Sequence, residues 1–142
     1  QRQMCIRDRN DADLRKIVKQ VKDAGLLNET YFISMHQSNL LSLQRLDGVN
    51  TSQLQYVYGA EDFNKTTSVT SSVISWCINN QIDLDTRQSL VTASDVYRLQ
   101  TAGRQVNVWT VNKADDLQYF IDEAADFITT NEPELLLDLL KK

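Results

Sequence analysis

Apolar residues follow two different spacings along the chain. In residues 10–25, Leu14, Val18 and Val21 recur at intervals of three and four, which places them on one face of a helix. Residues 31–35 (YFISM) form instead a short aromatic and β-branched run, typical of a strand that is covered on both faces. Helical and strand-like segments therefore alternate from the start of the pattern.

The complete pattern predicts five strands and six helices. The strands are expected over residues 31–35, 54–58, 82–85, 106–111 and 127–129, and the helices begin near residues 10, 38, 71, 92, 112 and 131. Strands that are each followed by a helix favour parallel β-α units with right-handed crossovers. Such units fit either a doubly wound sheet or part of a (β/α)8 barrel, and the local pattern does not choose between them.

Several residues mark where these elements end. Thr92 and Asp95 have the spacing of a capping box, in which each residue bonds the backbone of the other at the start of a helix. Asn112 is interpreted as the cap of the following helix. Gly59 follows a predicted strand where the backbone must turn sharply, and Gly103 supplies the left-handed end of a helix.

The length of 142 residues suits one domain. Residues 1–9 (QRQMCIRDR) have no helix or strand period and no initiator Met, and they are similar to the translated adaptor remnant found at the ends of assembled reads. They are therefore predicted to be a non-native or disordered arm outside the fold, which leaves residues 10–142 as the domain. A native frayed arm is the alternative.

Composition excludes several classes of function. Fifteen Lys and Arg against nineteen Asp and Glu give a net charge of −4, which argues against binding to nucleic acid. No apolar run approaches the roughly 18 residues of a membrane span, so a soluble protein is expected, with its compartment left open between the cytoplasm, the periplasm and secretion. Cys5 and Cys77 are too few for a disulfide framework, and the single His36 excludes a His-rich metal site.

Four segments indicate which of these two folds the chain has. Residues 89–96 (SLVTASDV), Gly103, residues 106–112 (VNVWTVN) and residues 126–131 (DFITTN) resemble the C-terminal end of the glycerophosphodiester phosphodiesterase family. Residues 31–35 resemble the same family more loosely. The family fold is a (β/α)8 barrel, which takes about 250 residues. The resemblance therefore implies that this chain is the truncated C-terminal portion of such a barrel.

The resemblance also implies an activity. The intact enzyme would hydrolyse glycerophosphodiesters, which are small molecules, to glycerol 3-phosphate and an alcohol. A divalent cation, Ca²⁺ or Mg²⁺, would neutralise the phosphodiester while two histidines act as acid and base. The family's paired histidines, its His-Arg-Gly turn and its metal-binding carboxylates lie on the first strands, and this sequence has no counterpart of them. No catalytic residue and no metal ligand are expected here, and the chain as given is expected to be inactive.

Within the matched segments the sequence departs from the family pattern at three places. Met35 and His36 stand where Phe and Asp or Asn are usual, Asn131 replaces an Asp, and Ala124 replaces a Gly. The first departure puts a standard polar or aromatic contact in question, whereas Asn131 is a mild change for a helix cap.

Active sites of β/α barrels lie at the C-terminal ends of the strands. The candidates there are Ser34, His36, Tyr58, Asp85, Arg87, Trp109, Thr110 and Thr129. We assign substrate binding to Trp109, Ser34 and His36. Alternation along residues 106–111 puts Asn107, Trp109 and Val111 on one side, which the resemblance favours as the barrel interior. Plain core packing is the alternative for Trp109, and a solvated loop position is the alternative for His36.

A second function class stays open. The chain could be a non-catalytic α/β binding domain or a degenerate barrel homologue. A His-Arg-Gly segment and paired carboxylates upstream of Asn10 would support the enzyme, and a native start near that residue would support the binding domain.

Overall fold

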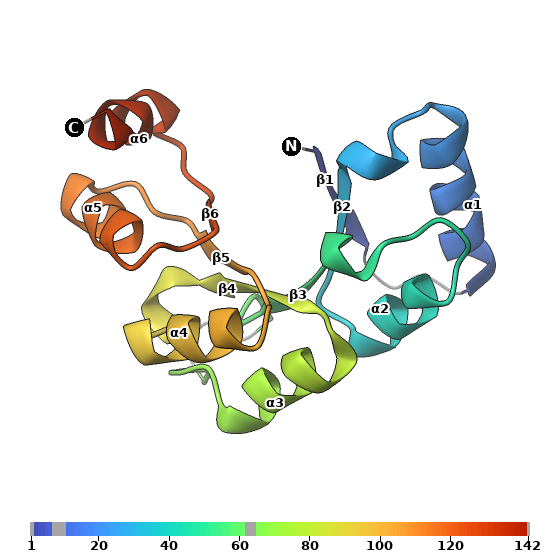
Figure 1. The fold of residues 1–142 in the computed structure, drawn as a ribbon, viewed down its shortest axis with the longest axis horizontal. Helices are drawn as coiled ribbons and strands as arrows, with labels where there is room; N and C mark the ends of the chain where they lie inside the picture. The colour runs from blue at the N-terminus through green and yellow to red at the C-terminus, as the bar shows by residue number, and fades with distance from the viewer. Residues whose placement is uncertain (1, 7–10, 62–64, 142) are drawn as a thin grey trace.

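The computed structural model of the chain describes residues 2–6, 11–61 and 65–141. Strands and helices alternate through these ranges, with short 3-10 turns between some of them (Figure 1). The strands are β1 (Arg2–Ile6), β2 (Thr30–Ser34), β3 (Leu54–Tyr58), β4 (Asp83–Arg87), β5 (Val106–Trp109) and β6 (Phe127–Ile128). The helices are α1 (Asp11–Asp23), α2 (Gln37–Gln44), α3 (Ser71–Asn80), α4 (Ala93–Thr101), α5 (Ala114–Asp122) and α6 (Pro133–Leu140).

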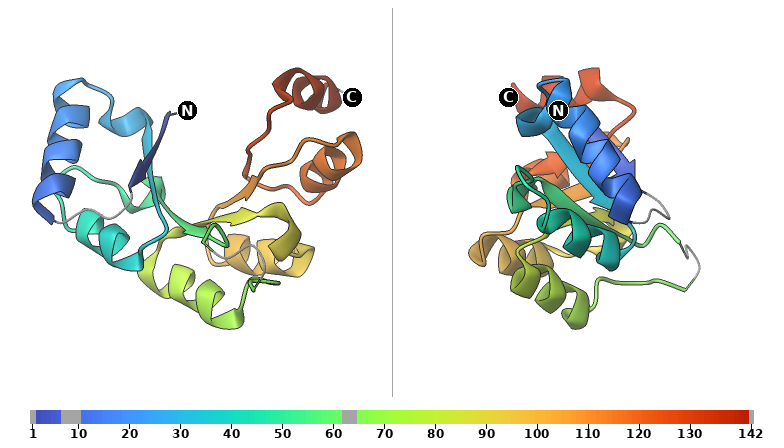
Figure 2. Two further views of the ribbon diagram at one scale, coloured as in Figure 1. Left: turned by 180° about the vertical axis from the view of Figure 1, so that it is seen from behind. Right: turned by 90° about the vertical axis from the view of Figure 1, so that its right-hand side faces the viewer.

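All described strands belong to one parallel sheet, whose order follows the sequence from β1 to β6. The sheet curls, with the helices along its convex side and the two ends of the chain on opposite arms of the opening (Figures 1 and 2). The curl is strong enough for the rings of Tyr31 on β2 and Phe127 on β6 to meet edge to face, with centroids 5.4 Å apart. The predicted parallel β-α units are confirmed, and their arrangement is that of an incomplete (β/α)8 barrel.

The convex face of the sheet carries the apolar core. Strand residues Phe32, Leu54, Leu84, Val106 and Val108 are buried under the helices. They belong to two clusters, one beneath α1 and α2 and the other beneath α3, α4 and α5. Burial of this apolar surface holds the helices on the sheet.

Cys77 on α3 is fully buried in the second cluster, and burial raises the pKa of its thiol to about 12. It is a small core residue, as the sequence indicated.

Two of the expected end signals are confirmed in detail. Thr92 and Asp95 form a complete capping box at the start of α4. Gly59 ends β3 with φ +86°, and a Cβ atom there would lie 2.3 Å from the side chain of Leu90. Only glycine fits this turn without displacing Leu90.

The expected role of Asn112 is wrong. Helix α5 is preceded by Lys113, and no side chain caps it. The Oδ1 of Asn112 instead accepts hydrogen bonds from the backbone N–H of Asn131 (2.9 Å) and from the hydroxyl of Thr130 (3.4 Å). Asn112 therefore ties together the loops that follow β5 and β6. Asn131 does not cap the last helix either, because the residue that precedes α6 is Glu132.

The predicted strand over residues 106–111 ends earlier, at Trp109. The alternation therefore stops there, and Val111 lies in the buried core cluster beneath the helices instead of on the side of Trp109. Its N–H bonds the carbonyl of Thr129.

The first nine residues were assigned to an arm without regular structure. Within them, Arg2–Ile6 forms β1, which pairs in parallel with β2 from Arg2 against Thr30 to Ile6 against Ser34. Residues 7–10 lie outside the described residues. Whether the segment is native to the protein stays a prediction.

Candidate functional site

The concave face of the sheet is polar where the convex face is apolar. Register pairs Asp85 on β4 with Val57 on β3 and with Asn107 on β5, and it pairs Arg87 with Trp109. Side chains alternate along a strand, so these residues point away from the helix-covered residues Leu84 and Val108. The concave face therefore collects Gln55, Asp83, Asp85, Arg87, Asn107, Trp109 and Thr129.

Asp85, in the middle of β4, is the carboxyl group of this face whose pKa is raised furthest. Its side chain is buried, with the residue 3% exposed, and it accepts a hydrogen bond from the indole of Trp109. Burial raises the pKa of Asp85 to about 7, and the bond from Trp109 opposes part of that rise. The Oδ1 atom has no hydrogen-bond partner among the described residues. One oxygen of Asp85 thus holds Trp109, and the other is available to a ligand or water.

Two amide side chains lie near Asp85 on the same face, Asn107 beside it on β5 and Gln55 one step earlier on β3. Asn107 is 1% exposed, and its Oδ1 accepts a hydrogen bond of 3.2 Å from the hydroxyl of Thr129. Its Nδ2 has no partner among the described residues, and neither has the Oε1 of Gln55. A buried polar atom without a partner costs about 1 to 3 kcal/mol, so most such atoms in proteins bond water or a ligand. On the concave face, several buried side-chain atoms therefore remain for water or a ligand to bond.

Asp83 marks the opposite, N-terminal end of the same face. Its Oδ1 accepts a hydrogen bond from the backbone N–H of Gln105 (2.9 Å) and lies 3.5 Å from the guanidinium of Arg104. Burial raises the pKa of Asp83 to about 6, while these two partners lower it. We assign Asp83 to the scaffold, because its partners tie β4 to the chain entering β5.

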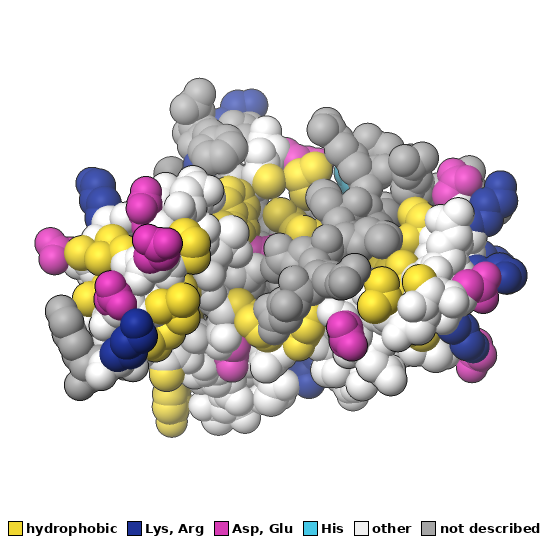
Figure 3. Space-filling view, turned by 90° about the horizontal axis from the view of Figure 1, so that it is seen from above, with side chains coloured by type: hydrophobic (Ala, Val, Ile, Leu, Met, Phe, Trp, Pro, Cys, Tyr) yellow, Lys and Arg dark blue, Asp and Glu magenta, His cyan; other side chains and the backbone are white. Residues whose placement is uncertain are grey.

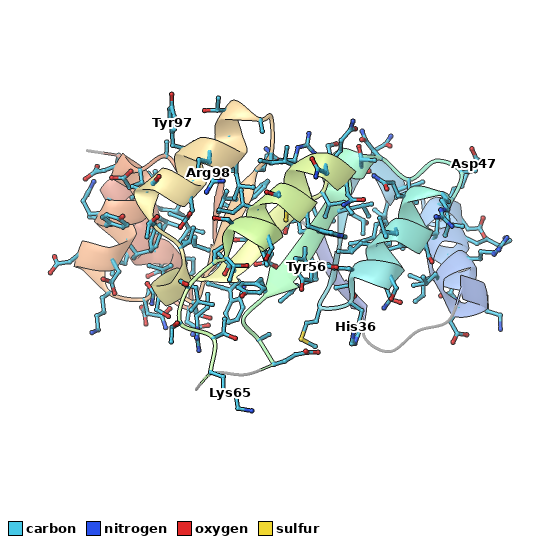
Figure 4. All side chains as sticks on the ribbon, turned by 90° about the horizontal axis from the view of Figure 1, so that it is seen from below. His36, Asp47, Tyr56, Lys65, Tyr97 and Arg98 are labelled. Carbon is cyan, nitrogen blue, oxygen red and sulfur yellow. The ribbon has the colours of Figure 1, made fainter. Side chains whose placement is uncertain are left out.

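Ser34 does not lie with Trp109. It shares the convex face of β2 with Phe32, and its hydroxyl oxygen accepts hydrogen bonds from the side chain of Asn39 (3.4 Å) and from the backbone N–H of His36 (3.1 Å). His36 itself is half-buried at the N-terminal end of α2, where Figure 4 shows it. Only Met35 separates it from the end of β2, so it lies at the same end of the sheet as Trp109.

The other candidates at the strand ends have structural partners. Arg87 donates a hydrogen bond of 2.8 Å to the carbonyl of Thr66, which fastens the loop before α3. The hydroxyl of Tyr58 donates to the carbonyl of Ser68 (3.4 Å) on the convex side. Thr110 is exposed, and its carbonyl accepts from the amide of Gln88 (2.9 Å).

A cavity of about 610 Å³ extends from the concave face along β6. Asn107 and Thr129 line it on one side and Leu136 and Leu140 of α6 on the other. Figure 3 looks onto the opening of the sheet, and outside the area covered by undescribed residues most charged side chains lie toward its two ends.

Within the described ranges, no three or more His, Cys, Asp or Glu side chains come together as a metal ion would require. In the same ranges, no helix combines the length and the apolar character that a membrane crossing needs.

The concave face and its strand ends define the class of fold. A curled parallel sheet, helix-covered outside, whose buried polar residues lead to an aromatic side chain at the C-terminal strand ends, is part of a β/α barrel. No protein-family model matches the sequence, and no curated protein matches it significantly.

Solved structures of glycerophosphodiester phosphodiesterases share this fold. The chain is similar to the enzyme of Parabacteroides distasonis, with a TM-score of 0.78 and 23% identity over 98% of this chain and 56% of that one. It is similar to the enzyme of Thermotoga maritima, with a TM-score of 0.69 and 19% identity over 96% and 56%. It also matches a phosphodiesterase of Oleispira antarctica in complex with the product sn-glycerol 3-phosphate, with a TM-score of 0.72 and 15% identity over 93% and 50%. The chain thus spans about half the length of these structures and has the fold of that part of their barrels.

Proposed function

We propose that this chain forms the C-terminal part of a barrel that hydrolyses glycerophosphodiesters to glycerol 3-phosphate and an alcohol. The observation that carries the proposal is the shared fold, which extends over nearly the whole chain and over about half of each phosphodiesterase. Active sites of such barrels lie at the C-terminal ends of the strands. In this chain Trp109 ends β5 on the concave face, and its indole bonds Asp85 in the middle of β4.

In this proposal the residues of the chain bind the substrate and exclude water. The indole of Trp109 is the wall of the pocket for the glycerol moiety, since an aromatic ring covers carbon-bound hydrogens while its N–H stays bonded to Asp85. His36 stands at the rim of the same end, and Ser34 serves it indirectly by accepting its backbone N–H. Thr129 and Asn107 line the cavity along β6.

The divalent cation of such enzymes finds no set of ligands here. Asp83 and Asp85 share a face, but Asp83 bonds Gln105 and pairs with Arg104, whereas Asp85 holds Trp109. Among the described residues, no group of three or more His, Cys, Asp or Glu side chains forms around these two carboxyl groups. The described residues therefore do not fit the ion, and no step of hydrolysis is assigned to it.

The proposal is tested by completing the barrel. We would co-express the whole chain, residues 1–142, with the part of the Parabacteroides distasonis enzyme that this chain does not match, and assay glycerophosphocholine hydrolysis with added Ca²⁺ or Mg²⁺. The chain alone should give no turnover above a buffer blank, because it carries no acid-base pair. The complex should hydrolyse the substrate. A complex that is folded by circular dichroism and still inactive would contradict the proposal and favour a binding domain without catalysis.

A further inference from the structure

Asp85 and Trp109 come from neighbouring strands and meet on the concave face. Register places Asp85 beside Asn107, and it places Trp109 beside Arg87, two residues further along β4. The indole must therefore lean back toward the N-terminal end of the sheet to donate its N–H to the carboxyl group of Asp85. This contact fixes the direction of the ring, since an indole has a single hydrogen-bond donor.

We propose that the Asp85 carboxylate is the positioning residue of this site, which holds the indole of Trp109 in one orientation at the mouth of the barrel. The proposal concerns the conformation of Trp109 and goes beyond the proposed hydrolysis. It stands whether or not the complete barrel cleaves a phosphodiester.

The other ionisable side chains of this face have partners elsewhere, which leaves Asp85 to hold the indole of Trp109. Among the described residues on the concave face, the other ionisable side chains are Asp83 and Arg87 on β4 and Tyr31 on β2. Asp83 bonds the chain entering β5, and Arg87 bonds the loop before α3. On the two strands that flank β4, the described residues of this face are Gln55, Val57, Asn107 and Trp109, which carry no charge.

The strength of the contact depends on the protonation of Asp85. A hydrogen bond to a carboxylate is roughly twice as strong as one to a neutral group. Burial raises the pKa of Asp85 to about 7, so both forms are populated near neutral pH. Ionisation then tightens the bond from the indole, and protonation loosens it.

The test follows the two indole N–H resonances of the whole chain labelled with 15N-tryptophan. Trp76, on α3, packs against Tyr56 on the helix-covered side and serves as the control within the same molecule. From about pH 5 to about pH 9, the Trp109 resonance should move to lower field with one midpoint near pH 7. The Trp76 resonance should stay in place. A Trp109 resonance that does not move, or that moves only together with Trp76, would overturn the proposal.

Two variants assign the transition to its group. Asp85→Asn should abolish the movement of the Trp109 resonance, and Asp83→Asn, which changes the other buried carboxyl group of β4, should leave it. A transition that persists in Asp85→Asn would refute the role of Asp85. If circular dichroism shows that Asp85→Asn does not fold, Asp85→Glu replaces it as the test. This variant keeps a carboxylate and should shift the pH midpoint of the Trp109 resonance. An unchanged midpoint in Asp85→Glu would count against the proposal.

Discussion

Both faces of the sheet contain deeply buried side chains, and the most deeply buried ones differ in chemistry between the two faces. On the convex face, Phe32 and Leu84 are fully buried by apolar helix residues, and the contact is complete. On the concave face, Gln55, Asp85 and Asn107 are almost as deeply buried and keep polar atoms without partners. The apolar contacts of the convex face stabilise the fold, whereas the unpartnered polar atoms of the concave face are able to bond a ligand or water. The difference separates residues that hold the barrel together from residues that serve its site.

The comparison predicts its largest effect on the convex face. Phe32→Ala removes a fully buried ring from the cluster beneath α1 and α2 and should lower the free energy of unfolding by about 3 to 5 kcal/mol. Urea unfolding followed by circular dichroism measures it. A loss below about 1 kcal/mol would mean that this face is not the core.

A second prediction concerns the dependence of stability on pH. Burial raises the pKa of Asp85 from 3.8 to about 7, so the folded state holds this proton more tightly than the unfolded state. The contribution of Asp85 to the free energy of unfolding is fully present below about pH 4. It is lost as the pH rises through 7, by about 4 kcal/mol in total. The pKa of Asp83 is raised to about 6, so its own contribution to the free energy of unfolding is lost over a pH range that ends lower than that of Asp85.

Asp85→Asn separates the two contributions. Unfolding free energies of the variant, measured from about pH 4 to about pH 8, should still fall up to about pH 6 because Asp83 remains, and should then level off. A variant that keeps the decline of the parent between pH 6 and 7 would show that Asp85 is not the titrating group.

The smallest effect is expected from an apolar substitution on the concave face. In Gln55→Leu, a buried amide whose Oε1 has no partner among the described residues is replaced by a side chain of similar size. Loss of the amide removes an unmet hydrogen-bonding requirement, so the free energy of unfolding should change by less than about 1 kcal/mol or rise. Thermal unfolding decides the point, and a loss as large as that of Phe32→Ala would remove the distinction between the faces.

Much of the fold could be predicted from the sequence because its signals are local. The helical spacing of Leu14, Val18 and Val21, the capping box of Thr92 and the turn at Gly59 each involve residues within a few positions of one another, and the structure confirms them. The position of Asn112 could not be predicted, since its partner Asn131 lies nineteen residues later.

The candidate site was predictable in part. The alternation of residues 106–109 placed Trp109 opposite Val106 and Val108, as the structure has it. The face on which Ser34 lies could not be predicted, because the apolar residues of β2 occupy both faces and leave the phase of that strand undefined. Gln55 was missed, although a polar residue within an apolar strand is a signal that could have found it.

The most direct measurement compares the two tryptophans in the completed barrel. Trp109→Phe, on the concave face, should lower kcat/KM for glycerophosphocholine, because it removes the bond to Asp85 and part of the pocket wall. Trp76→Phe, whose ring packs on Tyr56 beneath α3, should lower Tm and leave kcat/KM unchanged. A Trp109→Phe barrel with unchanged kcat/KM and a lowered Tm would show that Trp109 is core packing and would contradict the account.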